Sequence, residues 1–127
     1  MSKQANLGRA IIVDADADTA RNLSVLLSQW GYETSWATSS WQALELIQRS
    51  KPSVVVIDAG LPVTNGWQLT QIVRSRFSTA DIKLIVLATR TTIAPPAHER
   101  VYDALLLKPV VIKKLREAVE AFFAATS

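Results

Sequence analysis

Cysteine is absent from the 127 residues of the chain, which also contains only four glycines and one histidine. Without cysteine, neither a disulfide scaffold nor a thiolate metal site can form. No apolar run approaches the ~18 residues that a membrane-spanning helix needs, and no stretch near the amino terminus looks like a secretion signal. We therefore expect a cytoplasmic protein that does not associate with membranes, with one domain over residues 1–127.

Positive charge exceeds negative charge only slightly. The formal net charge is +3, and the 14 Lys and Arg residues are spread along the chain. The densest group, Lys113, Lys114 and Arg116, falls where a helix would turn it toward solvent. We therefore predict that this domain does not bind nucleic acid.

Two kinds of apolar pattern alternate along the chain. Five short runs predict strands at residues 10–14, 32–37, 54–58, 84–88 and 105–107. Between and after them, apolar residues recur three and four positions apart, which predicts helices. Five strands separated by helices predict an α/β fold, in which helices cover both faces of a parallel sheet.

Local signals indicate where several helices begin. Asp16 or Asp18 can cap the first helix, and Ser39 followed by Gln42 is a capping-box pattern for the second. The pair Pro95-Pro96 allows at most a short or irregular fourth helix within residues 89–102. The last helix is predicted to bury four apolar residues: Ile112, Leu115, Val119 and Phe122.

Four tryptophans are many for a chain of this size. We expect Trp30 and Trp36 to pack in the core or at its edge. Trp41 and Trp67 fall in first helical turns, where they could be partly exposed, and exposed tryptophan is enriched at protein interfaces. The single histidine, His98, is expected in a solvent-facing loop.

The carboxyl ends of the predicted strands are where a parallel sheet of this kind binds ligands. The residues there are Asp14, Asp58, Ala88 or Thr89, and Lys108. Two carboxylates suit a hard cation such as Mg²⁺, and a lysine suits a phosphoryl oxygen. An Asp beside both can act as a nucleophile toward phosphorus. Asp, Asp and Lys at the ends of three different strands therefore predict a phosphoryl site.

Three segments carry a family resemblance: IIVDADADTARNLSVLLSQWGY, VVVIDAGLPVTNGWQL and LLLKPV. Over residues 9–123 or so, the chain resembles the receiver domain of two-component response regulators. The resemblance is strongest at Asp58 with Pro62 and Gly66, and at Lys108-Pro109; Ala43-Leu44 also matches. It implies a doubly wound, flavodoxin-like sheet of five parallel strands in the order 2-1-3-4-5.

The resemblance also implies a function in phosphorelay signalling rather than as an enzyme. Asp58 would be the phosphoacceptor, and Lys108 would contact the phosphoryl group. Mg²⁺ would be held by Asp14, Asp58 and the carbonyl of Gly60. The implied partner is a sensor histidine kinase, a histidine phosphotransfer protein or another signalling protein.

The chain departs from the family at three positions. Ala15 stands where receivers usually have a second acid, Ala88 where they have Thr or Ser, and Leu105 where they have the switch aromatic. Fewer carboxylates hold a divalent cation less tightly, and a phosphoryl group without differential contacts cannot shift a conformational equilibrium. We therefore expect weak Mg²⁺ binding, weak switching and action largely through protein–protein contacts.

One enzymatic alternative stays open. Asp14 and Asp16 form an Asp-x-Asp motif after the first predicted strand, as in phosphatases of the haloacid-dehalogenase type, whose nucleophile would be Asp14. In those phosphatases Thr or Val occupies the position of Asp18. This chain also lacks the acidic pair that they carry near a later strand. A dinucleotide-binding fold is not predicted, because no Gly-rich turn follows the first strand.

Overall fold

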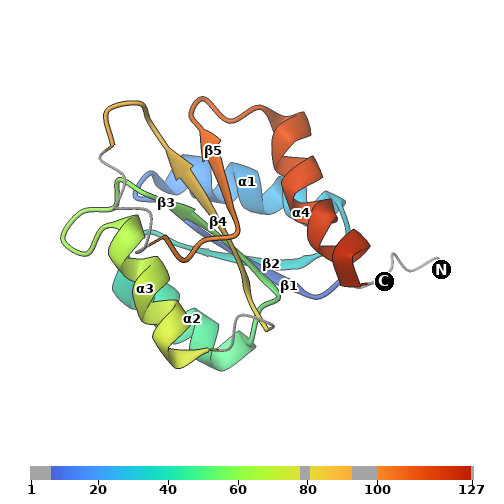
Figure 1. The fold of residues 1–127 in the computed structure, drawn as a ribbon, viewed down its shortest axis with the longest axis horizontal. Helices are drawn as coiled ribbons and strands as arrows, with labels where there is room; N and C mark the ends of the chain where they lie inside the picture. Colours follow the sequence, from blue (N-terminus) through green and yellow to red (C-terminus); the bar gives the residue numbers. More distant parts are fainter. Residues whose placement is uncertain (1–6, 78–80, 93–99, 127) are drawn as a thin grey trace.

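The structure, a computed structural model, describes residues 7–77, 81–92 and 100–126. Five parallel strands form one sheet in the order β2-β1-β3-β4-β5, as predicted (Figure 1). The strands are β1 (Arg9–Val13), β2 (Glu33–Ala37), β3 (Val54–Asp58), β4 (Lys83–Ala88) and β5 (Ala104–Leu107). The described helices are α1 (Ala17–Gln29), α2 (Ser40–Ser50), α3 (Gly66–Arg76) and α4 (Ile112–Thr126).

Each face of the sheet has its own apolar core. Alternate strand residues such as Ile12 and Val56 pack with α1 and α4, while their neighbours Ile11 and Val55 pack with α2 and α3. This division follows from the two-residue period of a strand, which turns successive side chains to opposite faces. Burying each Val, Leu or Ile completely contributes about 1.5–3 kcal/mol. The central strand β3 is buried along its whole length and carries Asp58 at its end.

Side-chain caps fix the beginnings of three helices. Asp16 caps α1 by accepting a hydrogen bond from the Asp18 N–H at 3.0 Å, which confirms the first of the two predicted caps. Ser39 caps α2 through the Gln42 N–H, although the Gln42 side chain reaches back to Thr38 instead of Ser39. A complete capping box begins α3, where Asn65 and Gln68 accept hydrogen bonds from each other's backbone.

One burial prediction was wrong, and one open position is settled by the structure. Ile112 is 42% exposed, because it is the first residue of α4, and the helix contacts the sheet through Leu115 and Val119 instead. Trp67, for which partial exposure was possible, is buried, because α3 begins against the sheet and packs the indole against Val86 and Ala88.

The other tryptophans can be compared with the expectations. Trp36, expected in the core or at its edge, is 38% exposed on the edge strand β2 and belongs to neither core. Trp41 is 72% exposed, and Trp30 packs at the edge of the core. The possible helix near Pro96, the side chain of Phe122 and His98 lie outside the described residues. No helix in the described part of the chain combines the length and apolarity needed to cross a membrane.

Candidate functional site

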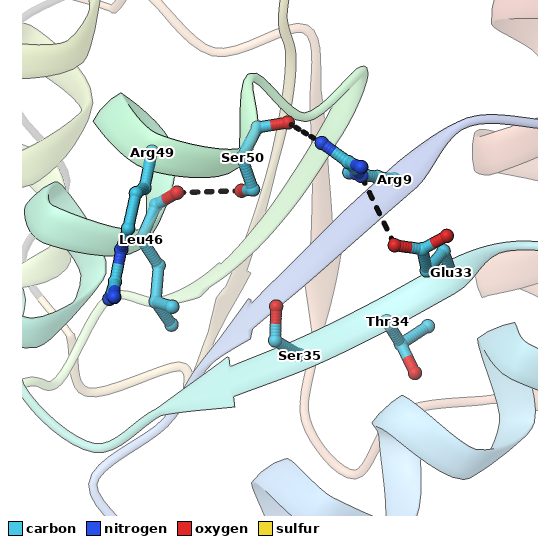
Figure 2. A pocket seen from close by; sticks show the side chains of 7 residues that line it. All are labelled: Arg9, Glu33, Thr34, Ser35, Leu46, Arg49 and Ser50. Carbon is cyan, nitrogen blue, oxygen red and sulfur yellow. Dashed lines mark hydrogen bonds and ion pairs between the residues drawn. The ribbon is translucent and has the colours of Figure 1, made fainter.

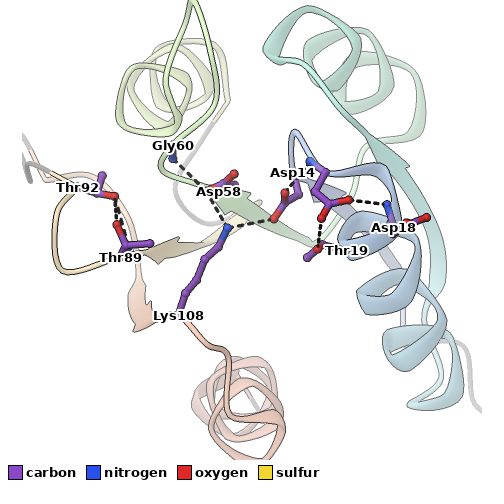
Figure 3. A network of polar contacts seen from close by, with 9 residues as sticks. Asp14, Asp18, Thr19, Asp58, Gly60, Thr89, Thr92 and Lys108 are labelled. Carbon is purple, nitrogen blue, oxygen red and sulfur yellow. Dashed lines mark hydrogen bonds and ion pairs between the residues drawn. The ribbon is translucent and has the colours of Figure 1, made fainter.

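Asp14, Asp58 and Lys108 meet at the carboxyl edge of the sheet (Figure 3). Asp14 directly follows β1 and Asp58 ends β3, so the two carboxylates stand on neighbouring strands. Lys108 follows β5, which lies two strands away from β3, and its side chain reaches across the edge toward both carboxylates. The three residues predicted from separate strand ends therefore form a single cluster.

Lys108 binds both carboxylates. Its Nζ lies 3.1 Å from Oδ1 of Asp58 and 3.3 Å from Oδ2 of Asp14. The side chains of Asp14 and Asp58 are only 3% and 12% exposed, and that of Lys108 is 27% exposed. Two carboxylates this close together and this deeply buried need a counter-charge, and the ammonium supplies it.

Burial and neighbouring charge shift the pKa values of Asp14 and Lys108. Burial raises the pKa of Asp14 and the nearby Asp58 charge adds to it; the Asp16 N–H and Lys108 oppose both. Burial would lower the pKa of Lys108, but the hydrogen bond to Asp58 and the Asp14 charge outweigh it, so the pKa is raised. Lys108 is thus held in its charged form by the two carboxylates.

Backbone groups orient both carboxylates. Oδ1 of Asp14 accepts the Asp16 N–H at 2.9 Å, and Oδ1 of Asp58 accepts the Gly60 N–H at 3.0 Å. Gly66 allows α3 to begin directly against this loop: a Cβ there would collide with the Asp58 carbonyl oxygen and lie 2.6 Å from Cα of Ala59. The Gly66 N–H also donates to the Ala59 carbonyl at 3.0 Å. Any larger residue at position 66 would therefore displace the segment that carries Asp58.

The side chains and carbonyl at this edge are of the type that binds Mg²⁺, but they include one carboxylate fewer than the family pattern has. Asp14, Asp58 and the Gly60 carbonyl offer oxygen ligands of the kind Mg²⁺ prefers. Ala15, at the position of the missing acid, is exposed and offers no ligand. Asp16 does not replace it, because its carboxylate accepts hydrogen bonds from the Asp18 N–H and from Oγ1 of Thr19, at 3.1 Å. The described residues contain no group of three or more acidic or histidine side chains that could hold a metal.

The end of β4 presents no hydroxyl to this cluster. Ala88 is buried, and Oγ1 of Thr89 lies 3.0 Å from that of Thr91 and 2.8 Å from that of Thr92. Figure 3 shows Thr89 and Thr92 paired with each other, away from Asp58. Leu105, the apolar residue at the switch position, is 39% exposed on the edge strand β5.

A shallow hollow of about 280 Å³ lies at the opposite, amino edge of the sheet (Figure 2). Arg9 lines it, with Nε 3.2 Å from Oε1 of Glu33 and Nη1 donating to the Ser50 carbonyl at 2.8 Å. Ser50 Oγ donates to the Leu46 carbonyl. Arg9 is thus engaged by Glu33 and Ser50, and we assign the hollow no ligand.

Arg74 makes buried contacts that the sequence did not predict. Its side chain, only 9% exposed, pairs with Asp103 and donates to the carbonyls of Val101 and Ile82 at 2.8 and 2.6 Å. An arginine in the last turn of an amphipathic helix ordinarily faces solvent, so no local signal indicated this contact. The Trp67–Tyr102 contact, with ring centroids 5.7 Å apart, was also missed because it joins segments distant in sequence.

Comparison with known proteins gives a consistent result. Residues 10–120 match the response regulator receiver domain family. The chain is 29% identical to the DNA-binding response regulator MtrA of Mycobacterium tuberculosis (strain ATCC 25618 / H37Rv), covering 89% of this chain and 49% of MtrA. It is also 29% identical to the protein RcaC of Microchaete diplosiphon, over 80% of this chain and 16% of RcaC. The chain thus spans half or less of these relatives.

Solved structures show the same fold. A response regulator receiver domain from Clostridium thermocellum superposes with a TM-score of 0.83 at 22% identity, covering 94% of this chain and 97% of that one. A CheY-like receiver domain from Methanospirillum hungatei JF-1 gives a TM-score of 0.80 at 20% identity, covering 94% and 98%.

Proposed function

The chain belongs to the response regulator receiver domain family, and we propose that Asp58 accepts a phosphoryl group from a phosphohistidine. The donor would be a sensor histidine kinase or a histidine phosphotransfer protein. The observation that carries this proposal is the contact of Lys108 with both Asp58 and Asp14 at the carboxyl edge of the sheet. That arrangement supplies a buried nucleophile and a fixed positive charge for the phosphoryl oxygens.

The two oxygens of Asp58 have different surroundings. Oδ1 accepts the Gly60 N–H and contacts Lys108, while Oδ2 receives no hydrogen bond from the residues that the structure describes. Oδ2 is therefore the atom that attacks phosphorus. A P–O bond forms to Asp58, the P–N bond breaks, and its electron pair stays on the imidazole nitrogen, which takes a proton from solvent. Lys108 can then transfer its contact from the carboxylate to the phosphoryl group.

A bound Mg²⁺ would neutralise phosphoryl charge at this site. Asp14, Asp58 and the Gly60 carbonyl are the groups that would hold it. With Ala15 beside them in place of a further carboxylate, we infer a weak affinity. Lys108 competes for the same carboxylate oxygens, which weakens binding further.

The response to phosphorylation is limited in this proposal. Ala88 and Leu105 can make no polar contact to a phosphoryl group, and Thr89 is engaged within its own turn. The domain therefore acts mainly through contacts of its surface with another signalling protein and catalyses no turnover of its own. The exposed Trp41 is one candidate for such a contact.

Nothing supports the phosphatase alternative. Asp16, the second carboxylate of the Asp-x-Asp motif, caps α1, and Asp18 pairs with Arg21 on the helix surface. Neither is directed into a common site with Asp14. None of the relatives or structures named above is a phosphatase.

Mass spectrometry after incubation with a small phosphodonor and Mg²⁺ tests the proposal. We expect one added phosphoryl group, located at Asp58 and lost in Asp58→Asn. Asp81→Asn, which changes an exposed carboxylate for which the structure shows no described partner, is the matched control and should retain it. An adduct on Asp14, or one that survives Asp58→Asn, would contradict the assignment.

A further inference from the structure

The sequence of β5, the strand that precedes Lys108, does not by itself fix how the strand aligns with β4. β5 is a four-residue edge strand that pairs only with β4, and Leu105, Leu106 and Leu107 follow one another within it. Its side chains alternate between half-buried and exposed. Burial ordinarily fixes register because a one-residue shift turns every apolar side chain to the wrong face. Here such a shift would replace the inward Ala104 and Leu106 with Leu105 and Leu107, so burial discriminates poorly.

Directional contacts at the beginning of β5 specify one register. The Asp103 N–H donates to the Leu84 carbonyl at 2.8 Å, and Oδ2 of Asp103 accepts the Leu84 N–H at 2.8 Å. The same Oδ2 pairs with the guanidinium of Arg74. Arg74 also donates hydrogen bonds to the carbonyls of Ile82 and Val101, which lie just before β4 and β5. One buried side chain of α3 thus ties the starts of β4 and β5 together at a single alignment.

We propose that Arg74 and Asp103 are positioning residues of the phosphorylation site: they set the register of β5 and so place Lys108 against Asp58. The inference rests on the proposed function of Asp58 and adds residues at the other end of the sheet. In the observed register, Leu107 opposes Ala88, and Lys108 follows with its backbone N–H on the Ala88 carbonyl at 2.8 Å. A shift of one residue moves Lys108 by about 3.3 Å and reverses its direction, which breaks the 3.1 Å contact with Asp58.

Thiol labelling measures the register without reference to phosphorylation. Because the chain has no cysteine, Leu105→Cys and Leu106→Cys each introduce a single reporter. Leu105 is exposed and Leu106 packs against the core under α1 and α4, so Leu105→Cys should react several-fold faster. When Arg74→Met is combined with each reporter, the labelling rates of Leu105→Cys and Leu106→Cys should become similar or reverse their order. The reason is that a one-residue shift of β5 turns position 105 inward and position 106 toward solvent. Arg76→Met, an exposed arginine on the same helix, is the control and should leave the ratio unchanged.

A strand that merely loosens gives a different result. If Arg74→Met raises both labelling rates by the same factor and keeps their ratio, the proposal is wrong. Should Arg74→Met fail to fold, Asp103→Asn replaces it, since the amide oxygen can still accept the Leu84 N–H while the charge pair with Arg74 is lost. It must shift the ratio in the same direction, and an unchanged ratio in a folded Asp103→Asn overturns the proposal.

Phosphorylation supplies the second measurement. The rate of modification by the small phosphodonor should fall in Arg74→Met in proportion to the fraction of molecules that labelling shows in the shifted register. A full rate in a protein whose register has shifted would also overturn the proposal. If wild type itself is never modified at Asp58, the proposed function fails, while the labelling ratio still decides the role of Arg74.

Discussion

Lys108→Met should destabilise the folded chain strongly at neutral pH, and far less in acid. The substitution keeps much of the side-chain volume and removes the ammonium between Asp14 and Asp58. Two buried carboxylates would then face each other without a counter-charge. The structure allows the size of this effect to be worked out from distances and burial.

The ammonium lies 3.1 Å and 3.3 Å from the two carboxylate oxygens. At an effective dielectric constant of about 20, each contact corresponds to a Coulomb attraction of about 5 kcal/mol. The cost of removing the three groups from water offsets much of this. Removing one member of a buried ion pair nevertheless costs about 3–5 kcal/mol, because the remaining charge is left uncompensated. Since Lys108 is 27% exposed, we expect the lower value, about 3 kcal/mol at pH 7.

The pH dependence follows from Asp14. Burial already raises its pKa in the folded protein, so the ionised form of Asp14 reduces stability. The loss of folding stability caused by ionised Asp14 is absent below about pH 4, the pKa of Asp14 in the unfolded chain. It is complete above the pKa of Asp14 in the folded protein. Removing Lys108 raises the folded pKa of Asp14 further, so the destabilisation by Lys108→Met should grow as the pH rises from about 4 to 7.

Urea unfolding of four proteins at pH 4.5 and pH 7 measures the effect: wild type, Lys108→Met, Asp58→Asn and the double variant. The double variant should be more stable than Lys108→Met at pH 7, because only one buried carboxylate remains. Lys113→Met, on the solvent face of α4, should change stability by less than about 0.5 kcal/mol. A loss from Lys108→Met equal to that of Lys113→Met, or one that does not depend on pH, would refute the reasoning.

Two further predictions concern metal binding and switching. Ala15→Asp should strengthen Mg²⁺ binding, because a third carboxylate would stand beside Asp14 and Asp58. A Mg²⁺ titration would count against this if the wild type bound as tightly as a receiver domain with the second acid, or if the variant bound no more tightly than the wild type. Amide spectra with and without beryllofluoride should differ only near Asp58. A shift of a conformational equilibrium from 1:99 to 99:1 needs ~5.5 kcal/mol of differential binding, whereas a single polar contact to Lys108 supplies ~1 kcal/mol. Large changes across residues 100–110 would show that the switch works.

The fold was predictable because its signals are local and repeated. Strand positions, the parallel sheet and the cap at Asp16 follow from patterns of two to four residues. The juxtaposition of Asp14, Asp58 and Lys108 followed from topology, since the carboxyl ends of parallel strands share one edge. Two details depend on side-chain geometry that no sequence pattern encodes. They are which oxygen of Asp58 receives no hydrogen bond from the described residues, and how Lys108 divides its contacts between the two carboxylates.

What the sequence left open or predicted wrongly has a common physical cause. Trp67, Ile112 and Arg74 lie at or near helix ends, where the 3.6-residue period no longer determines which face meets the sheet. Trp67 is buried because α3 begins against β4, and Arg74 is buried because three acceptors from the β4 and β5 starts surround it. Such contacts join segments distant in sequence, so they become visible only when the strands are placed side by side.

The three departures from the family occupy positions where the fold tolerates a neutral side chain. Ala15 and Leu105 are exposed, and Ala88 packs as a small residue between Ala59 and Trp67. Lys108 is different, because losing it would leave the two buried carboxylates of Asp14 and Asp58 without a counter-charge. Neutral side chains are therefore compatible with the fold at these three positions, whereas the lysine between the two carboxylates also stabilises the folded chain. The ammonium that is proposed to contact the phosphoryl group is also the counter-charge that stabilises this edge of the sheet.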